Sequence, residues 1–97
     1  MAFENEFVVI LCKNSSVHTG YLVAVNPAEC WVILSETRCV WRWVGANSLN
    51  ELANNGASLE TFTRISEPVE KSLFTDVDRV ISCTPQAEDN LRKSRWL

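Results

Sequence analysis

Apolar positions in the first half of the chain come in short runs separated by turn residues, a pattern typical of β-strands. The run at residues 7–11 is apolar at every position, so a strand there needs a cover on both faces, supplied by a helix layer or by another subunit. Turn residues such as Asn26-Pro27 divide the following stretch. The predicted strands are residues 6–12, 18–25, 30–34 and 38–44, and their short connections predict an antiparallel meander that begins with a hairpin.

Two helices are indicated by the residues at their ends. Ser48 and Glu51 have the spacing of a capping box, and Gly56 can adopt the left-handed conformation that ends a helix, so a two-turn helix is predicted between them. Thr84 as N-cap and Pro85 in the first turn predict a C-terminal helix that runs to about residue 95.

Between the two helices the pattern is weaker. Residues 61–65 alternate enough to predict a short strand, residues 69–74 have no clear assignment, and residues 76–83 predict a last strand. The expected fold class is α+β: a small antiparallel β-meander of four to six strands, with a short helix after the fourth strand and a C-terminal helix. A chain of 97 residues is expected to form a single domain over residues 1–97.

Composition and charge narrow the functional classes. The net charge of −3 and the pI near 5.0 argue against a dedicated nucleic-acid binder, which needs clustered cations to neutralise phosphates. No apolar run reaches the roughly 18 residues of a membrane span, and Glu4 and Glu6 stand where a signal peptide would carry basic residues. The chain is therefore expected to be cytoplasmic, with no membrane partner.

Catalytic and metal-binding chemistry finds little support. The four cysteines include no C-x-x-C pair and have apolar neighbours, so they are expected to be free and buried, and no metal site is predicted. His18 is the only histidine, and no nucleophile motif accompanies it. We therefore expect a non-enzymatic protein, with no catalytic residue and no cofactor.

The fourth predicted strand carries the strongest binding signal. The period of two along a strand puts Trp41 and Trp43 on one face, and Arg38 and Arg42 on the other. The two tryptophans can be core residues beneath the following helix, which is the more frequent case, or they can form a surface on which a nucleobase stacks.

The two arginines of this strand leave three interpretations open. They can line a solvated face, pair with Glu29 or Glu36, or clamp an anionic ligand through bidentate hydrogen bonds. In the last case His18, in the predicted hairpin, is a candidate to assist. The predicted ligand-binding residues are therefore Arg38, Arg42, Trp41, Trp43 and His18.

Three motifs follow one another along the chain: Val17-His18-Thr19-Gly20, a block of the form R-x-x-W-x-W-x-G-A-x-S-L-x-x-L-A that starts at Arg38 and is followed by Gly56, and Ile81-Ser82-Cys83-Thr84. With these motifs the chain resembles a family of small, functionally uncharacterised proteins of tailed phages and prophages. The resemblance implies a phage origin and the cytoplasm of the host cell, and it implies no established activity. Small phage proteins of this size often counter host defences, an analogy of context.

These observations predict a non-enzymatic phage accessory protein that counters host immunity. In the first hypothesis it binds and sequesters a nucleotide-derived signal molecule, an anionic ligand. In the alternative it is a protein-interaction module that inhibits a host defence protein directly. A homo-oligomer is expected in either case, because a strand that is apolar on both faces can be covered by a second subunit.

Overall fold

The computed structural model describes residues 5–42, 48–56 and 64–93. Strands and helices follow in this order: β1 Phe7–Cys12, β2 Val17–Asn26, β3 Trp31–Arg42, α1 Leu49–Asn55, β4 Arg64–Ile65, β5 Val69–Phe74, β6 Val77–Ser82 and α2 Pro85–Lys93. The predicted α+β class and the opening hairpin of β1 and β2 are confirmed.

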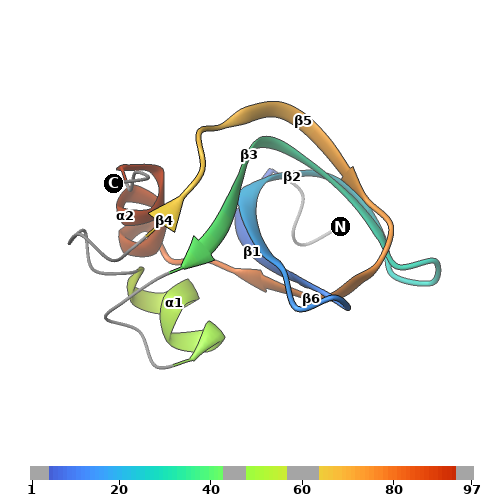
Figure 1. The fold of residues 1–97 in the computed structure, drawn as a ribbon, viewed down its shortest axis with the longest axis horizontal. Helices are drawn as coiled ribbons and strands as arrows, with labels where there is room; N and C mark the ends of the chain where they lie inside the picture. The colour runs from blue at the N-terminus through green and yellow to red at the C-terminus, as the bar shows by residue number, and fades with distance from the viewer. Residues whose placement is uncertain (1–4, 43–47, 57–63, 94–97) are drawn as a thin grey trace.

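All described strands belong to one antiparallel sheet. β1 is central, with β2 on one side and β6 on the other, and β3 follows β2. The far edge of β3 pairs with β5 along its first half and with β4 along its second half. Figure 1 shows that the sheet curls strongly, with α1 and α2 gathered at one end of it. The two edge strands β5 and β6 are joined directly by residues 75 and 76.

The two strands predicted on either side of Glu36 are one long strand, β3, so that prediction was wrong. Glu36 has a φ of 49°, and the register with β2 slips here: Tyr21 stands opposite Ser35 and Thr19 opposite Arg38. One extra residue in β3 is a β-bulge, which bends a strand without ending it. The polar residues that suggested a turn therefore mark a bend, and the short helix follows the third strand.

The second half of the chain holds a strand that the sequence left unassigned. Residues 69–74 form β5, an edge strand on which Val69 and Leu73 are largely exposed, so the alternation expected of a half-buried strand is weak. The predicted strand at 61–65 is observed as β4, limited to Arg64–Ile65 within the described residues. The C-terminal helix is described to Lys93; residues 94 and 95 lie outside the described ranges.

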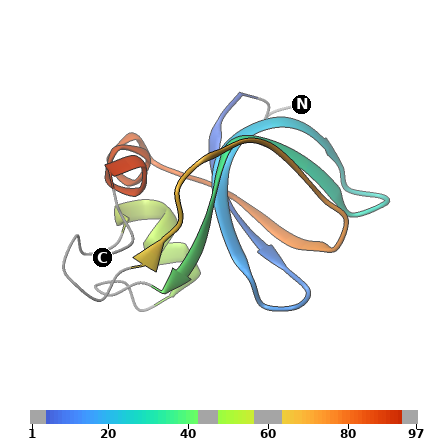
Figure 2. The ribbon, with the colours of Figure 1, turned by 45° about the horizontal axis from the view of Figure 1, so that its top comes forward.

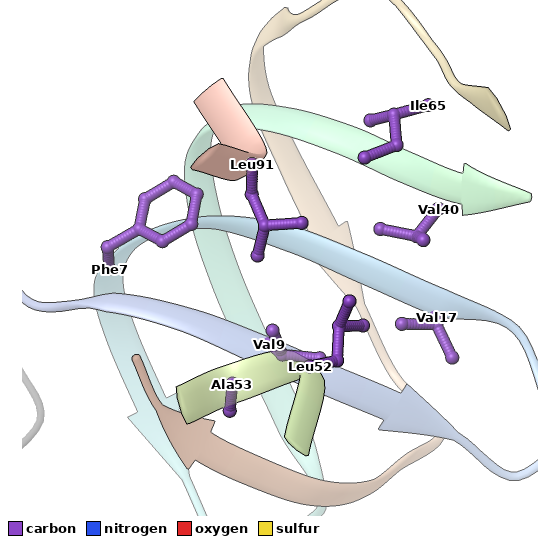
Figure 3. Close-up of a cluster of buried hydrophobic side chains, with 8 residues drawn as sticks. All are labelled: Phe7, Val9, Val17, Val40, Leu52, Ala53, Ile65 and Leu91. Carbon is purple, nitrogen blue, oxygen red and sulfur yellow. The ribbon is translucent and has the colours of Figure 1, made fainter. Parts of the chain in front are cut away.

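The helices cover one face of the sheet. A cluster of buried side chains joins both helices to the strands, as Figure 3 shows: Phe7, Val9, Val17, Val40, Leu52, Ala53, Ile65 and Leu91. In the view of Figure 2 both helices lie beside the ends of β3 and β4, away from the curled part of the sheet. A helix layer thus covers one face of the apolar strand β1.

The other face of β1 points into the curl of the sheet. A second cluster fills this space: Val8, Ile10, Cys12, Leu22, Val32, Leu34 and Val77. Val8 and Ile10 alternate with Val9, so the continuous apolar run at residues 7–11 supplies both clusters.

Both helices begin as predicted. The Ser48 Oγ accepts a hydrogen bond from the Glu51 N–H (3.1 Å), and the Thr84 Oγ1 accepts one from the Ala87 N–H (3.1 Å). Gly56 ends α1 with a φ of 78° and a ψ of −166°, a positive-φ backbone conformation that glycine adopts more readily than other residues. The Thr84 N–H also donates to the carbonyl oxygen of Ala53 (3.1 Å), which ties the start of α2 to α1.

Gly20 provides a test of the close packing beside the bulge. A Cβ on this residue would lie 2.7 Å from the carbonyl oxygen of Ser35 and 3.1 Å from the Cβ of Leu34, so the two strands would have to separate. We expect Gly20→Ala to lower the free energy of unfolding by about 1–3 kcal/mol, measured by urea denaturation. Val23→Ala on the same strand, where Val23 is 42% exposed, is the control and should change it by about 0.5 kcal/mol or less. Equal effects of the two substitutions would contradict the close approach.

Candidate functional site

Arg38 is buried, in contrast to the surface position predicted for it. Its side chain is 8% exposed. The Nε donates to the carbonyl oxygen of Ser66 (2.7 Å), and Nη1 donates to those of Leu91 (2.8 Å) and Arg92 (2.9 Å). The last two carbonyls belong to the final turn of α2, where a helix leaves its C=O groups without intrahelical partners and presents the negative end of its dipole. Arg38 thus fastens the end of α2 to the sheet.

For Arg38 itself, the interpretation as part of a solvated or ligand-facing surface is therefore wrong. Val40, on the same face, is 3% exposed and belongs to the cluster beneath the helices. The helices cover this face, and the backbone carbonyls of Ser66, Leu91 and Arg92 accept hydrogen bonds from the buried guanidinium. A structural role accounts for Arg38, and we leave it out of the candidate binding residues.

His18 lies on β2 and faces away from Arg38. It stands opposite Cys39, the residue after Arg38, and successive side chains on a strand point to opposite faces. Its ring centroid is 4.5 Å from that of Phe74, and its Nε2 lies 3.1 Å from the Ser16 Oγ. Burial lowers the pKa of His18, and the charge of Asp76 opposes this shift only in part. The structure therefore does not bring His18 and Arg38 together.

Three of the predicted binding residues have no described side chain. The backbone of Trp41 and Arg42 forms the end of β3, next to β4. Their side chains, and all of Trp43, lie outside the part of the chain that the structure describes. A role for these three residues in binding stays a prediction.

A pocket of about 290 Å³ lies between the outer end of the β2–β3 hairpin and β6. Its walls come from three strands and the hairpin turn: Leu22, Val25, Asn26, Pro27, Cys30, Trp31, Val32, Val77, Asp78, Arg79 and Val80. The N–H of Val77 donates to the carbonyl oxygen of Cys30 (3.1 Å), which holds the hairpin turn against the start of β6. The pocket thus continues the apolar interior of the curled sheet to the surface.

Trp31 is the aromatic residue and Arg79 the basic residue among those that line this pocket. Trp31 is half-buried at the start of β3 and is one of the residues that line the pocket. Arg79 is exposed, and one of its five N–H donors is used by the Asn50 Oδ1 (2.9 Å). An apolar pocket that Trp31 helps to line can hold a planar ring.

The sequence pattern did not indicate this pocket. Asn26-Pro27 was correctly predicted as a turn, and the tryptophan shortly after it is the only local signal. The opposite wall comes from β6, about fifty residues further along the chain, and only the pairing of β6 with β1 brings it there.

The cysteines are free thiols, as expected. Cys12 is buried as predicted, whereas Cys30, Cys39 and Cys83 are only half-buried. Burial raises the pKa of Cys12 and Cys39, and raises that of Cys83 to about 12, so these three thiols stay protonated at neutral pH. Within the described residues, no group of three or more His, Cys, Asp or Glu side chains could hold a metal ion.

The family of the chain is shown by a family model, DUF6948, a domain of unknown function, which matches residues 5–91. The chain belongs to this family. The matched part of this DUF6948 protein includes the pocket and most of α2. No curated protein matches the chain. Neither helix in the described residues is long and apolar enough to cross a membrane.

The attachment of α2 by Arg38 can be measured through stability. Arg38→Met keeps the bulk of the side chain but leaves the carbonyls of Ser66, Leu91 and Arg92 without these donors. We expect the free energy of unfolding in urea to fall by about 1.5–3 kcal/mol, the range for hydrogen bonds to charged groups. Lys93→Gln, which removes an exposed ion pair with Asp89, is the control and should cost about 0.5 kcal/mol or less. Equal stability of the two variants would show that Arg38 does not hold α2.

The lowered pKa of His18 predicts a pH dependence of stability. The unfolded chain binds the His18 proton near its ordinary pKa of 6.5, whereas the folded protein binds it only at lower pH. The free energy of unfolding should therefore fall as pH decreases through 6.5 toward the folded pKa, because protonation then favours the unfolded state. Urea denaturation between about pH 5.5 and 7.5 measures this slope, and His18→Gln should flatten it. A variant with the same slope as the wild type would assign the pH dependence to other groups.

Proposed function

We propose that this DUF6948 protein is a non-enzymatic phage accessory protein that counters host defence in the host-cell cytoplasm. In this proposal it binds and sequesters a nucleotide-derived signal molecule. The phage origin and the context of host defence rest on the sequence motifs described above. The observation that supports ligand binding is the apolar pocket with Trp31 in its wall and Arg79 beside it.

The pocket suits one nucleobase with its sugar. Its volume of about 290 Å³ is at the lower end of the range of ligand pockets, so a larger cyclic nucleotide would place one base inside and the rest at the surface. Stacking on Trp31 would contribute about 1–3 kcal/mol. The exposed Arg79 side chain would have to turn away from Asn50 of α1 to meet a phosphate at the mouth of the pocket.

Sequestration requires no bond to be made or broken. A protein that removes a signal by binding it needs a dissociation constant below the concentration of the signal molecule. It must also be present in at least as many copies as that molecule. The proposed binding residues are therefore Trp31 and Arg79, while Trp41, Arg42 and Trp43 stay candidates from the sequence. His18 is not among the residues that line the pocket, and it stays a candidate from the sequence for a ligand contact beside Ser16 and Phe74.

Isothermal titration calorimetry tests ligand binding directly. The full chain is titrated with cyclic dinucleotides, cyclic trinucleotides, isomers of cyclic ADP-ribose and, for comparison, linear mononucleotides. Heat with at least one cyclic nucleotide, and recovery of that compound unchanged after heat denaturation, would support sequestration. Absence of heat with every compound would overturn the proposal, and conversion of a compound would show an enzyme.

The pocket is tested by two substitutions and one control. Trp31→Ala should weaken binding of the active compound by about fivefold to a hundredfold, because the stacking surface is lost, whereas Trp31→Phe should weaken it less. Arg79→Gln should weaken binding of phosphate-bearing ligands, while Lys13→Gln, which removes an exposed cation outside the pocket wall, should not. Unchanged affinity in Trp31→Ala would place the site elsewhere.

A second function is direct inhibition of a host protein. The specific observation in its favour is the set of exposed apolar side chains on the sheet, Val23, Val69 and Leu73. Co-purification from host lysate followed by mass spectrometry distinguishes the two functions. A stoichiometric host protein with no bound small molecule would favour inhibition, and a bound nucleotide would favour sequestration.

A further inference from the structure

β5 has one side that no described strand pairs with. Among the residues that the structure describes, it pairs only with β3, and it forms the top of the curled sheet in Figure 1. The other edge strand, β6, differs, because the N–H of Val77 donates to the carbonyl oxygen of Cys30 and the hairpin turn covers the start of that edge. The unpaired edge of a strand is a template for an extended segment of another chain.

The hydrogen bonds of the sheet show to which side each residue of β5 bonds. In an antiparallel sheet, the N–H and C=O of one residue point to the same neighbouring strand, and successive residues alternate. The N–H of Leu22 donates to the carbonyl oxygen of Glu6 just before β1 (2.9 Å), so Leu22 bonds toward β1 and Tyr21 toward β3. Tyr21 stands opposite Ser35, so Ser35 bonds back toward β2.

This alternation continues across β3 to β5. Leu34, next to Ser35, bonds toward β5, where it stands opposite Ser72. Ser72 thus bonds inward, and by alternation Val69, Lys71 and Leu73 direct their N–H and C=O groups to the outer edge. No backbone hydrogen bond joins these outward groups to another described segment.

The side chains along this edge define the strand that would complement it. Val69 and Leu73 are 53% and 61% exposed, and Glu70 and Lys71 between them are exposed and make no ion pair in the described part of the chain. A complementary antiparallel strand carries apolar residues opposite Val69 and Leu73. It carries an acidic residue opposite Lys71 and a basic residue opposite Glu70, because opposite charges on facing residues stabilise a strand pair.

We propose that the outer edge of β5 binds an extended segment of a protein partner, which adds to the sheet as an antiparallel strand. Along the partner chain the segment has the order apolar, polar, acidic, basic, apolar, and it faces residues 73 to 69 in turn. The inference rests on the second function proposed above, inhibition of a host protein, and gives that function a contact surface. It does not depend on the pocket.

A second copy of this chain suits the edge less well. In a two-fold pair of β5 strands, outward residues must meet outward residues, so one residue always faces its own copy. The register that pairs Val69 with Leu73 sets Lys71 against Lys71, and like charges directly opposite destabilise a strand pair. A segment of a different protein can carry the two charges in the opposite order and so avoid this repulsion.

Two synthetic peptides of equal composition test the order of the charges. Acetyl-Thr-Val-Thr-Glu-Lys-Val-Thr-amide has the proposed order, and acetyl-Thr-Val-Thr-Lys-Glu-Val-Thr-amide exchanges its two central residues. Each is titrated into the full isotope-labelled chain, and binding is followed by NMR through the backbone amides of Val69, Lys71 and Leu73. We expect the first peptide to have a dissociation constant at least about fivefold lower, because two facing pairs change from opposite to like charge in the second.

Exchange of the protein's own charges provides the matched variant. E70K/K71E keeps the composition and net charge of the edge and should reverse the preference between the two peptides. D89K/K93D exchanges an exposed ion pair on α2, away from this edge, and should leave the preference unchanged. Circular dichroism of each variant checks that the sheet is intact.

A backbone change in the peptide tests the strand pairing without altering the protein. The N–H of the peptide's Glu, opposite Lys71, bonds to β5 in this register, so N-methylation there should abolish binding. The N–H of the neighbouring Lys points away from β5, so N-methylation at that residue should leave binding within about threefold.

Each contrary result overturns the proposal. These results are equal dissociation constants for the two peptides, amide shifts confined to other parts of the sheet, and no binding at millimolar peptide. Shifts of the β5 amides that depend on protein concentration alone would identify a second copy as the occupant and would also overturn it. Nucleotide titration and co-purification of a host protein are scored separately, so their failure would concern the functions proposed above and not this edge.

Discussion

The structure depends on burying both faces of the sheet around β1. Val9 packs beneath the helices, while Val8 and Ile10 pack inside the curl, and all three are fully buried. Each buried aliphatic side chain of this size contributes about 1.5–3 kcal/mol, so a chain of 97 residues gains much of its stability from two thin layers that share one strand. The helices are therefore not accessory elements, because without them one face of β1 would meet water.

Arg38 helps to hold the two short helices against the sheet. α1 has seven residues and α2 nine, lengths at which isolated helices are unstable in water. Packing of Leu52 and Leu91 supplies the apolar contact, and the Arg38 guanidinium binds the carbonyls at the end of α2. A residue that resembles an anion-binding group in the sequence thus binds the negative end of a helix within its own chain.

Because the sheet curls, its apolar interior reaches the surface at the pocket for which ligand binding is proposed. The bulge at Glu36 bends β3, and the short connection through residues 75 and 76 carries the chain from one edge of the sheet to the other. As a result, β6 lies beside the β2–β3 hairpin, where the two form the pocket around Trp31.

The sequence alone predicted those helices, turns and strands that depend on interactions between residues close together in the chain. The caps at Ser48 and Thr84, the stop at Gly56, the β1–β2 hairpin and the two-faced apolar strand were all predicted, because each depends on residues close together in the chain. Tertiary structure decided the rest. A left-handed residue at Glu36 bends a strand rather than ending it only because β2 and β5 continue to pair on both sides of it. Arg38 is buried only because α2 ends above it, and Trp31 borders a pocket only because β6 returns to β1, contacts between segments that no periodicity along the chain records.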